Sequence, residues 1–181
     1  GTVSYRTYLG GGEYFAGIIA EIAGRVRVEK CTNYGTINGV QCVGGVYGGR
    51  IVSGLSNYNI TQTSNFGFVR GEKYVGGIAG HFSNNETINN SFNAGNITGE
   101  TNVGGIVGLG KACNANNCYN IGIVSYGIMG GNIVGSDDVL WGGASFENCY
   151  YSSTPANNNY GCAGIFENNV LEPDGFIAKT S

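Results

Sequence analysis

The chain has 181 residues, of which 41% are hydrophobic and 12% are charged, and its net charge is −3. It contains 34 glycines and 23 asparagines but only 2 prolines. Moderate hydrophobicity with little charge excludes classical disorder, and the lack of any basic run excludes phosphate-dominated binding of nucleic acid. No apolar run reaches the ~18 residues that a membrane-spanning helix needs.

A first repeated segment consists of an apolar residue, two small residues and then aliphatic residues. Its copies begin at Phe15, Val43, Val75, Val103 and Met129. Each copy is about six residues long, rich in Val and Ile, and closed by Gly or Asn, which is typical of strands. Val103 and Ile106 are both expected to face the core, so the Gly104-Gly105 pair between them predicts a bulge or a corner. The last copy is interpreted as carrying one extra residue, Asn132.

A second repeated segment reads small residue, x, Asn, x, Gly, x, aliphatic. Its asparagines are Asn33, Asn65, Asn93 and Asn120, with spacings of 32, 28 and 27 residues. Such a period at this glycine content indicates a solenoid. We predict that the four asparagines stack at one corner as an amide ladder along the axis. The alternative is a set of independent turns that merely tolerate a left-handed backbone.

The residue two positions before each of these asparagines is small. The occupants of this position are Cys31, Thr63, Ser91 and Cys118, with Cys149 in a degenerate last copy. We interpret them as a buried core stack, with Cys118 facing inward and Tyr119 outward. The cysteines form no C-x-x-C pair, which argues against a zinc or redox motif. In an oxidising setting, Cys113 with Cys118, or Cys149 with Cys162, are the pairs that the sequence suggests.

These patterns predict an all-β fold, a parallel β-solenoid of about five coils of roughly 26–32 residues, with three short strands per coil. Residues 1–151 are assigned to the repeats, and 152–181 to an irregular tail that is a candidate cap. Residues 1–5 match residues 122–126, so the N-terminal end is expected to start in mid-coil. An open coil leaves backbone groups for another chain to pair with.

Residues suited to catalysis or ligand binding are few. His81 is the only histidine and is expected to be an incidental surface residue. The segments between the two repeated motifs, 49–60, 81–86, 111–116 and 136–145, are expected to emerge on one edge. They contain the candidate ligand-binding residues Asp137, Asp138, Trp141 and Tyr58, among which the indole can stack on a sugar or seal the end of the core. No catalytic cluster, metal site or cofactor motif is found, so we do not expect an enzyme.

The repeats resemble GLUG-motif repeats. The matching residues are Gly77-Ile78-Ala79-Gly80 and Gly105-Ile106-Val107-Gly108, followed by Asn90-Ser91-Phe92-Asn93 and Asn117-Cys118-Tyr119-Asn120. The sequence departs from the motif in having Ile or Val in place of Leu. The resemblance implies a place in large exported bacterial surface proteins, including adhesins and non-catalytic parts of immunoglobulin-A-cleaving metallopeptidases, and it implies no activity for the repeats themselves.

The leading functional hypothesis is a non-catalytic structural or adhesive module at the bacterial cell surface, which acts as a rigid spacer or presents a binding edge. The alternatives are a fibre subunit that assembles through open solenoid ends and a carbohydrate-active β-helix enzyme fragment. The expected partners are further repeats or flanking domains of the same polypeptide, glycans or proteins of host or cell wall, and a second copy end to end. Neither nucleic acid nor a membrane span is expected.

Overall fold

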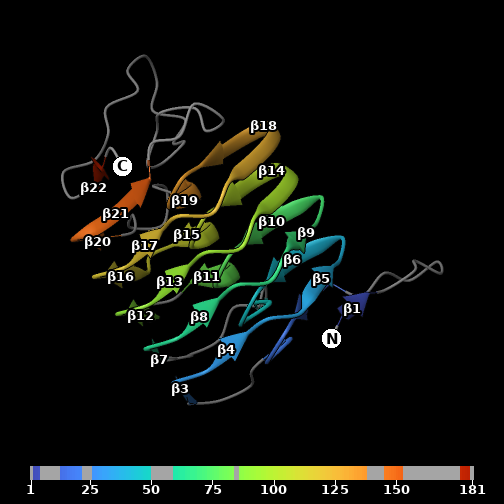
Figure 1. Ribbon diagram of the computed structural model, residues 1–181, viewed down its shortest axis with the longest axis horizontal. Coiled ribbons are helices and arrows are strands. Elements are labelled where there is room, and N and C mark those ends of the chain that lie inside the picture. The colour runs from blue at the N-terminus through green and yellow to red at the C-terminus, as the bar shows by residue number, and fades with distance from the viewer. Residues whose placement is uncertain are drawn as a thin grey trace.

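The computed structural model describes residues 2–4, 13–21, 26–49, 59–83, 86–137, 145–152 and 176–179. Within these ranges every element is a strand and every strand pair is parallel. The strands stack into a β-solenoid of about four turns, which confirms the predicted fold class. Figure 1 shows the stack rising from β3 and β4 at one end to β20 and β21 at the other.

Four parallel sheets run along the axis. The eight-stranded sheet contains β1 (Thr2–Ser4), β2 (Phe15–Ala16), β5 (Thr36–Asn38), β6 (Gln41–Gly44), β9 (Val69–Arg70), β10 (Lys73–Gly76), β14 (Ile97–Gly104) and β18 (Val124–Gly131). The three-stranded sheet contains β11 (Ala79–Ser83), β15 (Val107–Lys111) and β19 (Val134–Asp137). The five-stranded sheet contains β3 (Arg27–Glu29), β7 (Asn59–Thr61), β12 (Thr87–Asn89), β16 (Asn114–Asn116) and β20 (Ser145–Glu147). The six-stranded sheet contains β4 (Thr32–Asn33), β8 (Ser64–Asn65), β13 (Phe92–Asn93), β17 (Tyr119–Asn120), β21 (Cys149–Ser152) and β22 (Phe176–Lys179).

A coil is divided more finely than the three strands expected. The coil around β10, for example, continues through β11, β12 and β13 into β14, which turns a further corner within its own length. One cause is a column of left-handed residues between the five- and six-stranded sheets. These residues are Lys30, Gln62, Asn90, Asn117 and Asn148, with φ between 51° and 54°. A left-handed residue turns the chain sharply, so each repeat breaks into short straight pieces.

The predicted corner asparagines form one continuous hydrogen-bonded column. Asn33 Nδ2 donates to Asn65 Oδ1, Asn65 Nδ2 to Asn93 Oδ1, and Asn93 Nδ2 to Asn120 Oδ1, each at 2.7 Å. Each Nδ2 also donates to the carbonyl two residues on, and each Oδ1 accepts the amide N–H of that same residue. Both donors and both acceptor sites of an inner amide are therefore used, which makes burial tolerable. The next position in register after Asn120 is Tyr151, where the column ends.

The glycine pairs are required because the segment that carries them lies across the coil from the asparagine column and touches it. A Cβ on Gly77 would collide with the Gly105 carbonyl oxygen and with the side chain of Asn93. Gly45 meets Asn65 in the same way one coil earlier. We call this line of contact the waist, defined by the asparagine column and the second glycine of each pair. No side chain larger than hydrogen fits opposite an asparagine of the column, so in those coils the glycines set the thickness of the solenoid.

The waist divides the core into two compartments. The valine compartment comprises Phe15, Ile37, Val43, Val69, Val75, Ile97, Val103 and Val124. The mixed compartment comprises Val28, Val46, Tyr47, Ile60, Ile78, Ala79, Phe82, Ile88, Ile106, Val107, Cys113, Ala115, Cys118, Ile133, Val134, Phe146, Cys149 and Tyr151. Val103 and Ile106 are both fully buried, as predicted, but they face different compartments because the glycine corner lies between them.

The prediction that the copy beginning at Met129 carries one extra residue was wrong. The register pairs Val103 with Gly130 and Gly104 with Gly131, and Ile106 N donates to Ile133 O. Asn132 therefore occupies the position of the second glycine and is not an extra residue. Gly130 replaces a valine because a Cβ there would collide with the ring of Tyr126, which packs against the valine compartment instead.

The two outermost strands of the chain both join the stack. β1 pairs with β5 through Val3 and Ile37, in the column that continues to Val124. β22 pairs with β21, with Cys149 opposite Phe176. Residues 176–179, from the segment assigned to the tail, thus extend the six-stranded sheet by one strand.

Candidate functional site

Of the four predicted ligand-binding residues, only Asp137 lies in the described part of the chain. Asp137 is the last residue of β19, where Gly110 pairs with it. Asp138, Trp141 and Tyr58 lie outside the described residues. Asp138 and Trp141 fall in the sequence between β19 of the three-stranded sheet and β20 of the five-stranded sheet, and Tyr58 directly precedes β7 of the five-stranded sheet. The segment 111–116 is mostly strand, since β15 ends at Lys111 and β16 begins at Asn114.

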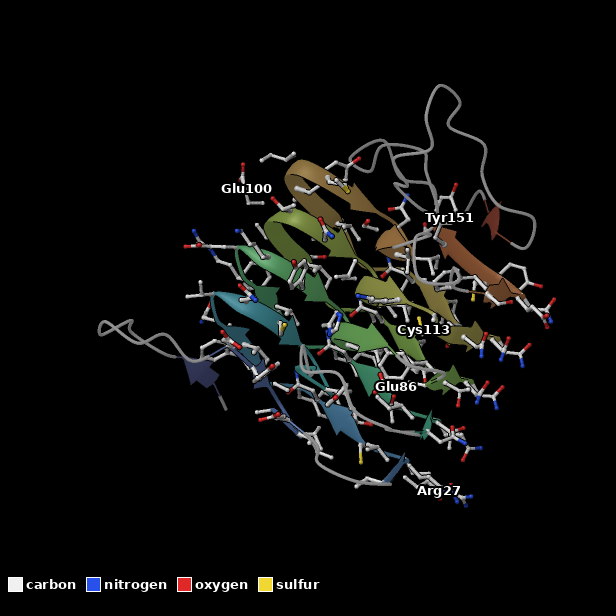
Figure 2. The ribbon with its side chains drawn as sticks, turned by 180° about the vertical axis from the view of Figure 1, so that it is seen from behind. Arg27, Glu86, Glu100, Cys113 and Tyr151 are labelled. Atoms are coloured by element: carbon white, nitrogen blue, oxygen red, sulfur yellow. The ribbon has the colours of Figure 1, made fainter. Side chains whose placement is uncertain are left out.

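His81 is not a surface residue, contrary to the expectation. Only 5% of its surface is exposed, and its ring centroid lies 5.9 Å from that of Tyr74. A Cβ on Gly49 would collide with His81, so the preceding coil closes over it. Glu86 is also buried, directly before β12, and its carbonyl accepts a hydrogen bond from Asn114 N. In Figure 2, Glu86 and Cys113 lie one above the other along the stack.

The predicted core stack lies in one column beside the waist. Thr63, Ser91, Cys118 and Cys149 are buried, and Cys31 is half-buried at the end of the column. Thr63 Oγ1 donates to Ser91 Oγ at 3.2 Å. The hydrogen bond with Cys149, followed by burial, raises the pKa of the Cys118 thiol. Tyr119 is exposed, as predicted from the alternation.

The feature that the sequence reasoning missed is a row of aromatic side chains on the outside of the six-stranded sheet. We call Tyr34, Phe66, Phe92 and Tyr119 the aromatic strip. The rings of Tyr34 and Phe66 stack with centroids 5.1 Å apart, and those of Phe92 and Tyr119 stack at 4.9 Å. Phe66 and Phe92 meet edge to face at 5.3 Å, so the four rings form one unbroken contact along the axis. These are the offset and edge-on geometries that aromatic pairs prefer.

The strip is open to solvent despite its apolar character. Tyr34 is 75% exposed, Phe66 45% and Tyr119 42%. Ile121 and Ile123, which follow Tyr119 closely in the sequence, are also exposed apolar residues. Beside the strip is an exposed amide row, in which Asn117 Nδ2 donates to Asn90 Oδ1 and Asn148 Nδ2 donates to Asn117 Oδ1, both at 3.3 Å. A contiguous apolar patch rimmed by polar groups is typical of an interaction surface.

A signal for the strip was present in the sequence. Aromatic residues stand next to the corner asparagine on one side or the other, as in Tyr34 after Asn33 and Phe92 before Asn93. The side chains directly before and directly after the asparagine both point outward. A ring at one position therefore meets a ring at the other position on the next coil only when the coils are stacked in register. The repeat pattern shows the alternation but not this contact between coils.

A shallow groove lies where the eight-stranded sheet turns its corner. Its volume is about 430 Å³, and its lining residues are Asn38, Gly39, Arg70, Gly71, Glu72, Thr98, Gly99 and Glu100. Glu100 N donates to Glu72 O, so the two glutamates occupy equivalent positions on adjacent coils. Figure 2 shows Glu100 at the edge of the solenoid far from Arg27. Sequence reasoning missed this groove as well, because its lining comes from three coils.

Metal and membrane features were sought in the described part of the chain. There, no three or more His, Cys, Asp or Glu side chains come together in a way that could hold a metal ion. Nor does that part contain a helix long and apolar enough to span a membrane.

No family model and no curated protein matches the sequence. The structure is similar to the crystal structure of a putative immunoglobulin A1 protease from Bacteroides ovatus, with a TM-score of 0.61 and 20% sequence identity. The similarity covers 93% of this chain and 56% of that one, so this chain corresponds to about half of the other protein. At this identity the similarity supports the solenoid fold.

Proposed function

We propose that this chain is a non-catalytic structural and adhesive module of an exported bacterial surface protein. The observation that carries the proposal is the aromatic strip, which presents exposed rings from four successive coils in one line. The fully bonded asparagine column behind it fixes the spacing of those coils. A surface held this rigidly loses little conformational entropy on binding, which favours affinity.

The partners proposed are glycans or proteins of a host or cell wall, with further repeats or flanking domains of the same polypeptide at the ends of the stack. Aromatic rings supply apolar area with few rotatable bonds, and the adjacent amides supply hydrogen bonds, which is a common composition of binding surfaces. The column beside the strip carries one charge, at Lys30, and is otherwise made of amides, including Asn90, Asn117 and Asn148. This composition favours a partner without strong charge.

The test compares a strip variant with a matched control on immobilised mucin and on immobilised peptidoglycan. The strip variant is Tyr34→Ser/Phe66→Ser/Tyr119→Ser, and the control is Ile18→Ser/Ile128→Ser, which removes exposed apolar area elsewhere. We expect the wild type and the control to bind one of the two surfaces equally, and the strip variant to bind at least about tenfold more weakly. Binding by none of the three, or equal binding by all, would contradict the adhesive role.

The enzyme alternative draws on one specific observation, the two glutamates of the groove. Their backbones lie on adjacent coils, whose parallel strands are about 4.8 Å apart, and a pair of carboxyl groups is the minimum that a glycosidase needs. We expect no release of reducing sugar from mucin or peptidoglycan by the wild type. Turnover that disappears in Glu72→Gln or Glu100→Gln would show that the module is an enzyme.

A further inference from the structure

We propose that Cys118 and Cys149 are a disulfide-forming pair that staples two neighbouring coils of the solenoid when the protein meets a disulfide oxidant. Of the two pairings suggested by the sequence, Cys113 with Cys118 is not the one that the coil register brings together. The other, Cys149 with Cys162, cannot be compared because Cys162 lies outside the described residues. The inference is independent of the proposed adhesive role.

The register places the two cysteines directly next to each other. Tyr119 pairs with Tyr150, and Tyr150 N donates to Cys118 O at 2.9 Å. Adjacent strands of a sheet are about 4.7–4.9 Å apart, which falls within the ~4.4–6.8 Å range of Cα separations in disulfides. Both side chains are fully buried in the mixed compartment, so they lie on the same face of the sheet. The register of the sheet therefore does not have to change to bring them together.

The two thiols already interact. One hydrogen bond links the two sulfurs. A carbonyl of the preceding strand also lies within hydrogen-bonding distance of each thiol, Asn116 O at 3.4 Å from Cys118 Sγ and Glu147 O at 3.5 Å from Cys149 Sγ. The other occupants of this column are Ser91, Thr63 and Cys31, so Cys31 is separated from the pair by two residues that cannot form a disulfide. Cys113 is in register with Glu86, and Cys42 with Tyr74.

The reaction is a thiol–disulfide exchange with a small or protein disulfide as oxidant. The thiolate of one cysteine attacks the oxidant, forming a mixed disulfide and releasing one thiol. The thiolate of the second cysteine then attacks the sulfur of the first and releases the second thiol. Two cysteine thiols lose two protons and two electrons, and the oxidant disulfide is reduced to two thiols. Because both sulfurs are buried, we expect exchange to occur before the last coils dock, or during local opening.

The bond closes a loop of about 30 residues, which restricts the unfolded chain far more than the folded one. It joins the residue directly before β17 to the first residue of β21, near the C-terminal end of the stack, where a coil has fewer neighbours to hold it. We therefore expect oxidation to raise the midpoint of thermal unfolding by on the order of 10 °C.

The single methionine, Met129, provides a direct assay, because cyanogen bromide cleaves the chain between the two cysteines. The full chain is refolded with oxidised glutathione, free thiols are alkylated in denaturant, and the cleaved sample is separated without reduction. We expect the fragments 1–129 and 130–181 to stay joined, and to separate after reduction. Sequencing of the joined fragments by mass spectrometry should place the link between Cys118 and Cys149.

The variants are Cys118→Ser and Cys149→Ser, with Cys113→Ser and Cys162→Ser as matched controls. Serine already fills this column at Ser91, so the first two variants are expected to fold. We expect the fragments to separate in Cys118→Ser and Cys149→Ser and to stay joined in both controls. Fragments that separate in the oxidised wild type, or that stay joined without Cys118, would overturn the proposal.

Discussion

The two compartments of the core share one wall, the waist, but they accept very different side chains. Seven of the eight buried members of the valine compartment are Val or Ile, whereas the mixed compartment contains tyrosine, phenylalanine, cysteine and alanine. The valine compartment accepts only small branched side chains over most of its length because corner glycines bring the backbone close to it. A Cβ on Gly71 or Gly99 would come within 2.7–2.9 Å of valine methyl groups, including those of Val75, so the corner backbone itself packs against this compartment.

The two ends of the valine compartment hold aromatic rings in place of Val or Ile. Phe15 stands at one end, and a Cβ on Gly39 would overlap its ring. Tyr126 packs at the other end, where Gly130 replaces the valine of the earlier coils. Both large rings therefore lie at the ends of the compartment, each directly against a glycine. The mixed compartment needs no such compensation because it lies between three sheets with side chains of different sizes.

The largest effect is expected at the waist, which supports both compartments. Asn93→Asp leaves Gly95 O and Asn120 Oδ1 without their donor and buries a carboxylate at a position with no exposed surface. We expect the free energy of unfolding to fall by about 3–5 kcal/mol. Urea denaturation followed by circular dichroism measures it.

The matched control for this change is Asn90→Asp, three residues away on the exposed amide row. Asp can still accept the hydrogen bond from Asn117 and tolerates the left-handed backbone there. We expect a change below about 0.5 kcal/mol. Equal losses in the two variants would mean that the asparagine column is not a structural support.

A smaller loss of stability is expected to distinguish the two compartments from each other. Val75→Ile adds one methylene to the valine compartment, and Val107→Ile adds the same group to the mixed compartment. Overpacking a tight site costs about 1–3 kcal/mol, so we expect a loss in this range for Val75→Ile and a loss below about 1 kcal/mol for Val107→Ile. Paired urea titrations give the difference. A larger loss for Val107→Ile would reverse the assignment of the tight compartment.

The smallest effect concerns Cys42, which precedes Val43 but belongs to neither compartment. Burial, with a contribution from the charge of Glu13, raises the pKa of its thiol from 9.0 to about 12. The folded state therefore holds this proton while the unfolded state releases it, so the stabilisation is complete below pH 9 and is lost as pH rises toward 12. The expected loss is about 1 kcal/mol between pH 9 and pH 10.

This loss should be absent in Cys42→Ala, which is compared with the wild type under reducing conditions at pH 8, 9 and 10. Removing the fully buried sulfur makes Cys42→Ala less stable at every pH, so the slope with pH is the quantity of interest. Parallel curves for the two proteins would show that the thiol ionises as freely in the folded state as in the unfolded state.

The sequence alone determined the fold class, because the repeat carries it. Strand-sized segments rich in Val and Ile, closed by Gly or Asn at a spacing of 27–32 residues, can bury their apolar side only by stacking on neighbouring copies. The recurrence of Asn33, Asn65, Asn93 and Asn120 led to the expectation of a column for the same reason. The GLUG resemblance and the place at a bacterial surface stay predictions.

Tertiary structure decided everything that depends on contact between different parts of one coil or between coils. The waist exists because Gly77 from one wall meets Asn93 from the other, and no local pattern states how far apart two walls lie. The burial of His81 depends on the coil that precedes it, and the aromatic strip depends on rings offset by two positions in the repeat. The pairing of Cys118 with Cys149, rather than with Cys113, follows from register. Sequence spacing fixes the period of a solenoid, whereas close packing between its turns decides which side chains meet.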